Sequence, residues 1–492
     1  MHRNLFAQQP SPPLLILMRI RCLLSVLAIT SSVVASGAGF SDRYNAIRAA
    51  ASPEELYRFL YALPKGGDLH NHFGGANFPE WMWEILNDPE RNGDDQFYAR
   101  VRFASPIEAI TPSVRYHTIR RFNYERLPST ERAEYAPLTE LNAEERSAWL
   151  DAFRLNPPHE GRTEFFSNQW PRQGDIYQNP HVRFELLAEN IKAFAAEGLR
   201  YLELQFGIDG MRTNDGRLLS RDDALPLMEA RLARPDVIDT GLVVRFQEMV
   251  LRFAPDAEQR LVDLYEWVDA NRDWWVGLNM AGIEENGKGY PRRFLETYRE
   301  LRNRLPTLPL SIHAGEMDGP DRHIRQTLLL GASRIGHGVN ILGDPDTLLM
   351  LQHSQRTLIE INLISNQLLE YVDDLARHPF PELLRTGVPV CLNTDDRGMW
   401  DSNMTDEYYT AVTAFNLSWE ELIQLGRNSL RYSFVDEATK ARLIADYEAD
   451  LEAFTLRYAS GSVQDALSEL KTVPAVTHGY AARKWGIQFT DL

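Results

Sequence analysis

The sequence predicts an α/β fold, a (β/α)8 barrel of the TIM type, with a large mostly helical insertion after the first strand and a helical C-terminal extension. Short apolar runs alternate about eight times with amphipathic stretches, as they do in parallel α/β proteins. Histidine and acidic residues directly follow several of these runs, at the strand ends where the active sites of barrels lie. No Gly-rich dinucleotide loop follows the first run, which argues against the rival, an open doubly wound sheet.

The expected elements follow in order. A helix begins after Ser52, a suitable N-cap followed by Pro53 in the first turn, and another spans 179–197, with Asn179 as cap and apolar residues at helical spacing. The C-terminal stretch from 405 to about 459 also has a helical pattern. Eight strands are expected, at 67–73, 199–206, 242–250, 275–280, 308–313, 334–339, 357–363 and 388–394.

The gap between the first and second runs is far longer than an ordinary βα connection, so residues from about 77 to 180 are expected to form an inserted subdomain. This stretch is rich in charged and aromatic residues. Its role stays open among a lid over the barrel mouth, a homodimer contact and a surface excursion. The rest of 39–492 is expected to form a single barrel domain.

Residues 1–38 have the pattern of a signal peptide, which predicts a secreted or periplasmic protein. Arg19 and Arg21 precede a short apolar core over 22–29, small residues follow at 35–38, and Met18 is an alternative start. An uncleaved anchor or a chance match is the alternative. No later stretch is long and apolar enough to span a bilayer.

The net charge limits the kinds of binding partner, and the cysteine content limits the possible disulfides. The formal net charge is −17, and removal of residues 1–38, which hold three arginines and no acid, makes it more negative. A nucleic-acid polymer and an anionic membrane are therefore unexpected partners, whereas a neutral small molecule meets no such barrier. The only cysteines are Cys22 and Cys391, so the chain without its signal peptide has no internal disulfide.

Two segments supply histidines. His70 and His72 lie two residues apart at the end of the first expected strand, so both side chains point the same way and one divalent ion can bridge them. His313 ends the fifth strand, and Glu316 follows Gly315, which permits a sharp turn. The alternative for each is an ordinary polar loop residue.

Two more segments complete the set. His337 lies between two glycines at the end of the sixth strand, where little covers its side chain. Asp395 and Asp396 close the eighth strand, and adjacent acids repel unless a cation or a donor compensates. A glycine turn and a helix-capping pair are the plainer interpretations. All four segments end strands on one face of the barrel, which makes coincidence a poor explanation.

These four segments together resemble the adenosine deaminase family of the metal-dependent amidohydrolase superfamily. The long insertion, the lead-in 64–67 and the NLISNQ segment at 362–367 are most similar to its secreted adenosine deaminase-related growth factor branch. The resemblance covers about 60–440. It implies hydrolytic deamination of adenosine or 2′-deoxyadenosine, a purine nucleoside as the small-molecule substrate, and a water activated by one Zn²⁺ per chain.

The resemblance also implies a role for each matched residue. Glu316 would protonate N1 of the purine, and His337 would orient the water and help to take its proton. Asp396 would accept a hydrogen bond near N7, Gly282 would lend its backbone to the purine edge, and His72 would border the substrate. The implied metal ligands are His70, His72, His313 and Asp395.

Three positions depart from the family pattern. Gly74 stands where cytosolic relatives have an aspartate that contacts the ribose, Asn279 where an aspartate is usual, and Arg397 where proline is often found. A modified adenosine, such as a 5′-modified nucleoside, or another purine therefore stays open as the substrate. A secreted binding module on an inactive barrel is the remaining alternative, although all the implied ligands are present.

Overall fold

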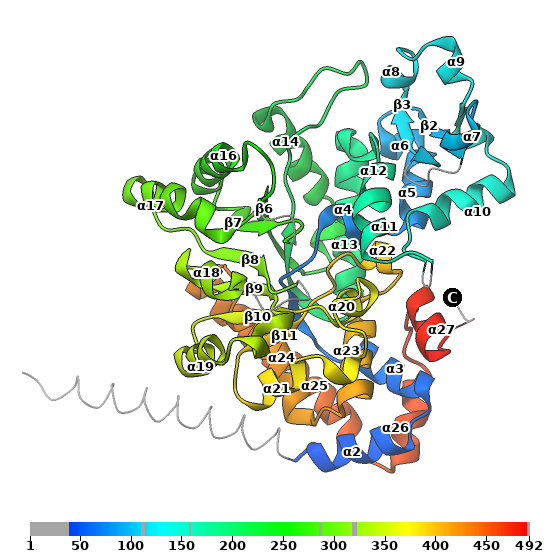
Figure 1. The fold of residues 1–492 in the computed structure, drawn as a ribbon. Coiled ribbons are helices and arrows are strands. Elements are labelled where there is room, and N and C mark those ends of the chain that lie inside the picture. Colours follow the sequence, from blue (N-terminus) through cyan, green and yellow to red (C-terminus); the bar gives the residue numbers. More distant parts are fainter. Residues whose placement is uncertain (1–38, 110–113, 157–158, 285–287, 317–321, 490–492) are drawn as a thin grey trace, which may run out of the picture.

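Eight parallel strands with helices around them form the body of the computed structural model, confirming the predicted (β/α)8 barrel (Figure 1). The structure describes residues 39–109, 114–156, 159–284, 288–316 and 322–489 of the 492. Each predicted run coincides with one strand. In sheet order they are β1 (Gly66–Asp68), β5 (Leu199–Gln205), β6 (Val243–Leu251), β7 (Trp275–Ala281), β8 (Leu310–Ala314), β9 (Arg334–His337), β10 (Leu358–Ile361) and β11 (Val390–Leu392).

The barrel closes where the segment after β1 meets the segment after β11. Asn71 and Asp395 form an isolated parallel bridge, and the amide of Asp395 donates to the carbonyl of His70 over 3.0 Å. Beneath it, the carboxylate of Asp68 accepts from the amide of Thr394 over 3.1 Å and from its hydroxyl over 2.6 Å. We call this junction the seam. Its hydrogen bonds put the first and last ligand segments side by side.

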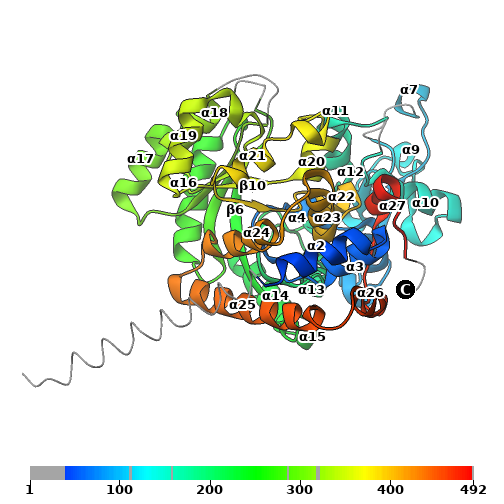
Figure 2. The ribbon, with the colours of Figure 1, turned by 90° about the horizontal axis from the view of Figure 1, so that it is seen from below.

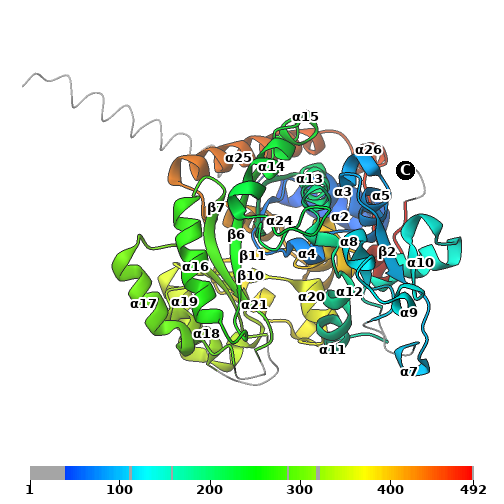
Figure 3. The same ribbon diagram turned by 90° about the horizontal axis from the view of Figure 1, so that it is seen from above.

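The connecting helices cover the outside of the strands (Figure 3). Asn179 caps α13 as expected, its side chain accepting from the amide of Val182, and Ser52 forms a capping box with Glu55 at α3 (Pro53–Ala62). Apolar faces of these helices pack on the buried strands in one continuous core. The outer helices include α13 (Pro180–Ala196), α14 (Arg221–Leu232), α16 (Ala257–Ala270), α17 (Leu295–Arg304), α18 (His323–Leu329), α19 (Pro345–Ser354) and α21 (Phe380–Arg385).

The predicted C-terminal extension is helical. It runs through α23 (Met404–Phe415), α24 (Trp419–Arg431) and α25 (Glu437–Ala459), and continues into α26 (Val463–Leu470) and α27 (Gly479–Trp485). Seen from below, α25 and α26 lie beside α3 and α2 (Ser41–Ala50), so both ends of the described chain cover the same side of the barrel (Figure 2).

The insertion projects from one side of the barrel and is mostly helical, as expected (Figure 1). It also holds a small antiparallel sheet that the sequence did not predict, with the order β3 (Thr118–Arg120), β2 (Phe97–Arg100), β4 (Tyr135–Pro137). Strands of three or four residues are too short to produce a readable alternation of polar and apolar residues. Its helices include α5 (Pro79–Leu86), α10 (Ala143–Ala152), α11 (Arg162–Glu164), the π-helix η3 (Phe165–Gln169) and α12 (Trp170–Arg172).

Two expectations concern the N-terminus and the membrane. The predicted signal peptide, residues 1–38, lies outside the described residues. Within the described ranges, no helix combines the length and apolar character that a bilayer span requires.

Candidate metal centre and active site

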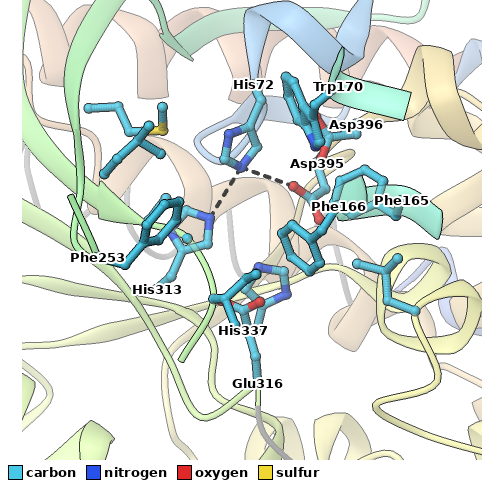
Figure 4. Close-up of a pocket in the computed structure, with 16 residues that line it drawn as sticks. His72, Phe165, Phe166, Trp170, Phe253, His313, Glu316, His337, Asp395 and Asp396 are labelled. Atoms are coloured by element: carbon cyan, nitrogen blue, oxygen red, sulfur yellow. Dashed lines mark hydrogen bonds and ion pairs between the residues drawn. The ribbon is translucent and has the colours of Figure 1, made fainter. Parts of the chain in front are cut away.

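The structure brings the four implied metal ligands together at the carboxyl ends of the strands, and Figure 4 shows three of them, His72, His313 and Asp395. The Nε2 atom of His72 lies 3.1 Å from Nε2 of His313 and 3.2 Å from Oδ1 of Asp395. The Nε2 atom of His70 lies 3.6 Å from the same carboxylate oxygen. Three ring nitrogens and one carboxylate therefore face a common point, although His70 and Asp395 are 325 positions apart in the chain.

This donor set fits a divalent transition metal. Four ligands at the usual ~2.0–2.1 Å from tetrahedral zinc are about 3.3 Å from one another, close to the spacings found here. The Nε2 atom of His70 is buried and has no hydrogen-bond partner among the described residues, as expected for a nitrogen that binds a cation. Burial lowers the pKa of His70, but the nearby carboxylates of Asp395 and Glu360 outweigh it and raise the pKa to about 10. The surroundings thus favour a positive charge at this point.

Polar side chains behind the ligands fix the imidazole rings. The Nδ1 atom of His70 lies 2.8 Å from Oε2 of Glu360. The Glu360 carboxylate also accepts from Ser311 and forms an ion pair with Arg334, whose Nε lies 2.6 Å away. The Nδ1 atom of His313 lies 3.0 Å from Oδ1 of Asn279. With both Nδ1 atoms engaged, each ring presents Nε2 to the centre, as outer partners of metal-binding histidines commonly ensure.

Two of the site residues have a backbone conformation that side chains rarely adopt. His337 has a φ of 66° and Asp395 a φ of 53°, both in the left-handed region. Such strain persists only where surrounding contacts enforce it, and it concentrates at functional sites. The hydrogen bonds of the seam supply that enforcement at Asp395.

Glu316 lies at the floor of the pocket, 8% exposed, with Oε1 3.8 Å from Nε2 of His337. Burial, and then the negative charge of Glu284, raise the pKa of Glu316 to about 8, although Arg252 acts in the opposite direction. The carboxyl group is therefore protonated at neutral pH and can donate a hydrogen bond or a proton to a substrate nitrogen.

Glu284 is a residue that the sequence analysis missed. Its carboxylate accepts from the amide of Gly315 over 3.0 Å and from the amide of Glu316 over 3.2 Å, and it lies 3.4 Å from Nη1 of Arg252. It therefore holds the turn that carries Glu316 and supplies the charge beside it. The only signal in the sequence is an acid two residues after Gly282, at the end of a strand.

Replacement of Glu284 by glutamine is expected to move the alkaline limb of the pH–activity profile to lower pH. Activity requires protonated Glu316 and is lost as pH rises through its pKa. Loss of the Glu284 charge lowers that pKa, because the charge stabilises the protonated form. Displacement of the turn should also lower kcat/KM at neutral pH by about 10–100-fold. Steady-state rates from pH 5 to 10 measure both effects.

The matched control is Glu266→Gln, at an exposed position on α16. A Glu284→Gln profile that superimposes on both the control and the wild type would contradict the role given to Glu284.

His337 is held from behind by an asparagine pair. Nδ2 of Asn362 and Nδ2 of Asn366 each lie 3.2 Å from its Nδ1 atom, and Oδ1 of Asn366 lies 3.3 Å from Nε2 of His378. Burial lowers the pKa of His337 well below its usual value and that of His378 to about 3, so both rings are neutral. The NLISNQ segment at 362–367 therefore contacts the site through Asn362 and Asn366, which hold His337.

The two residues expected at the purine edge also border the pocket. Asp396 is buried, and its Oδ1 atom has no hydrogen-bond partner within the described part of the chain. Gly282 has a φ of +106°, and a Cβ there would lie 2.5 Å from Cε1 of Phe253, so only glycine fits. Both have a free group to offer a ligand. These are the backbone of Gly282 and the carboxyl group of Asp396, whose pKa is raised well above its usual value by burial and by the charge of Asp395.

These residues surround a cavity of about 340 Å³, within the range of small-molecule sites. All the predicted site residues except the more deeply buried His70 line it. The insertion contributes Phe165, Phe166 and Trp170 to its wall, which no local pattern in the sequence indicated. The other apolar lining residues are Met249, Leu251, Phe253, Ala281, Ile283 and Leu369.

Comparison with known proteins gives a consistent picture. Residues 123–449 match the family model described as adenosine deaminase. An adenosine deaminase from Aedes albopictus is 26% identical over 445 residues, covering 82% of this chain and 77% of the relative.

Two solved structures are similar in fold. An amidohydrolase from Burkholderia ambifaria with bound Zn has a TM-score of 0.59 at 21% identity, covering 83% of this chain and 95% of that one. The Arabidopsis N6-mAMP deaminase has a TM-score of 0.56 at 19% identity, covering 79% and 99%.

Proposed function

The chain belongs to the adenosine deaminase family, and from this premise we propose that it hydrolyses adenosine and 2′-deoxyadenosine to inosine and 2′-deoxyinosine, with release of ammonia. Membership of this family makes the chain a deaminase that acts on adenosine-like substrates. The observation that carries the specific proposal is buried Glu316, with its raised pKa, beside three converging imidazoles and Asp395.

The proposal includes one Zn²⁺ per chain, held by four residues whose donor atoms lie close together: His70, His72, His313 and Asp395. Such a metal acts as a Lewis acid and lowers the pKa of water from 15.7 to about 7. The orphaned Nε2 of His70 and the fixed tautomers of His70 and His313 support this assignment.

The remaining steps belong to side chains of the pocket. Glu316 donates its proton to N1 of the purine, which draws electrons away from C6 and opens that carbon to attack by water. His337 orients the water and takes a proton from it, while Asp396 and the backbone of Gly282 hold the purine edge. The C6–O bond forms, His337 passes its proton to the amino group, and the C6–N bond breaks to release ammonia. The remaining hydroxyl proton returns to Glu316 as the C6 carbonyl forms. Positioned proton transfer of this kind typically contributes about 10²–10⁴-fold.

The direct test is a deaminase assay with purified, zinc-loaded protein. We expect the ultraviolet absorbance of adenosine to fall and that of inosine to rise, with equimolar ammonia and a kcat within the usual ~1–10³ s⁻¹. The panel includes 2′-deoxyadenosine, adenine, AMP and 5′-modified adenosines. If none of these aminopurines is converted, the proposed function is wrong.

The proposed location is outside the cytoplasm, in the periplasm or the medium. The pattern of residues 1–38 supports it, with its basic start, short apolar core and small residues at 35–38.

A further inference from the structure

The wall of the cavity that the insertion and the end of β6 form is apolar, and we propose that the cavity receives an adenine nucleoside whose 5′ carbon carries an uncharged apolar group in place of a hydroxyl or phosphate. The inference rests on the proposed deamination and specifies its substrate class. The chemical group in question is an alkyl or alkylthio substituent.

The wall of this region is built from two separate parts of the chain. Phe165, Phe166 and Trp170 reach the cavity from η3 and α12 of the insertion, while Leu251 and Phe253 come from the end of β6 and the turn after it (Figure 4). The carbon that bears the amino group must lie beside Glu316 and the metal ligands. The rest of the nucleoside therefore extends along these apolar side chains.

The charge of the cavity disfavours a phosphate. Its lining residues include the acids Glu316, Asp395 and Asp396, and none of its lining residues in the described ranges is lysine or arginine. The internal stretches outside the description, 110–113, 157–158, 285–287 and 317–321, contain no lysine or arginine either. A phosphate on the apolar wall would lie against aromatic side chains with no lysine or arginine of the lining to pair with, in a protein with a net charge of −17.

The guanidinium beside Glu316 is not available to a ligand. Arg252 approaches Glu316, with Nη2 3.8 Å from Oε1, but its side chain is buried behind the turn. There it donates from Nη1 to the carbonyl of His313 over 2.9 Å and pairs with Glu284. It does not line the cavity.

The tryptophan of the insertion occupies the space beside Gly74. A Cβ at Gly74 would lie 2.6 Å from Cζ3 of Trp170, so any side chain at this position would collide with the indole. The carbonyl of Gly74 is already engaged, by Nε2 of Gln173 over 2.8 Å and by the hydroxyl of Tyr177 over 2.9 Å. Position 74 therefore cannot hold the ribose-contacting aspartate that the resemblance implies for cytosolic relatives.

A 5′-hydroxyl would thus be buried against aromatic carbon without the partner that an acid at position 74 could supply. An apolar group at the same place would gain contacts with Trp170 and Phe166. One methylene in such a pocket changes kcat/KM by about 10–200-fold. We therefore expect at least about a tenfold preference for an apolar 5′ group over the hydroxyl.

The experiment measures kcat/KM of the zinc-loaded wild-type protein for 5′-methylthio-5′-deoxyadenosine, 5′-deoxyadenosine, adenosine and AMP. We expect the first to exceed adenosine by about tenfold or more, 5′-deoxyadenosine to lie at or above adenosine, and AMP to lie at least about 100-fold below it. A value for adenosine or AMP equal to or above that of the 5′-methylthio compound overturns the inference. Adenosine turnover in that same result would leave the proposed function standing, whereas no turnover of any compound overturns both.

Variants test which side chain produces the preference for an apolar 5′ group. In Trp170→Ala we expect the ratio of kcat/KM between the 5′-methylthio compound and adenosine to fall about tenfold, and in Gly74→Asp combined with Trp170→Ala to fall further. The matched control is Trp274→Ala, which removes a tryptophan just before β7, at the end of the barrel opposite the cavity. An unchanged ratio in folded Trp170→Ala overturns the role of the indole. The wild-type ratios stand as a test even if a variant fails to fold.

Discussion

Replacement of Glu316 by glutamine is expected to lower kcat for adenosine deamination by about 10³-fold, with little change in KM. The amide can still donate a hydrogen bond to N1 but cannot transfer a proton, so the transition state loses its acid while the ground-state contacts remain. Burial and the charge of Glu284 hold the acid in its protonated form in the wild type. Steady-state kinetics under zinc-loaded conditions measure the effect.

Two checks separate lost chemistry from lost structure. The variant should keep one zinc per chain and an unchanged unfolding midpoint, and Glu300→Gln, at an exposed position on α17, should keep wild-type activity. A Glu316→Gln protein that works within tenfold of the wild type would mean that another group protonates the purine.

Removal of the metal is expected to abolish turnover, by at least about 10⁴-fold, and addition of Zn²⁺ should restore it. Without the cation, the side chains of the pocket are left to activate water whose pKa is 15.7. Binding should also stabilise the fold, by about 2.7 kcal/mol when free zinc is 100 times its dissociation constant. Chelation followed by metal titration measures both, with activity and thermal unfolding as readouts.

His313→Ala should lose the activity and most of the thermal response to zinc. The matched control is His353→Ala, which removes an exposed histidine on α19 and should behave as the wild type. Full activity after thorough chelation, with no metal detected by mass spectrometry, would exclude the proposed metal centre.

The sequence predicted those parts of the site that depend on position along a strand. His70, His313 and Asp395 each follow an apolar run, and in a parallel barrel all such positions meet at one face. No knowledge of packing was needed, because the periodicity of the chain marks the strands and a (β/α)8 barrel arranges them in sequence order. The same logic predicted the barrel and its C-terminal helices.

The parts that depend on packing between distant segments were not predicted. Trp170 and Phe166 reach the cavity only because the insertion folds back over the barrel mouth, and nothing local in the sequence indicates that return. Glu284 and Asn366 act through contacts with loops whose course was unknown. Only Glu360 could have been recognised from the sequence, because a buried acid within an apolar run needs a partner, which is His70 here.

The seam between β1 and β11 makes the proposed metal site depend on completion of the polypeptide. Asp68 and Thr394, which join across it, are 326 positions apart, so a ribosome adding about 5–20 residues per second makes them roughly 16–65 seconds apart. Until the last strand emerges, the early histidines have neither their carboxylate partner nor a closed barrel. A product truncated before Val390 should therefore hold zinc poorly, and retention of the ion becomes a practical mark of full-length, correctly closed protein.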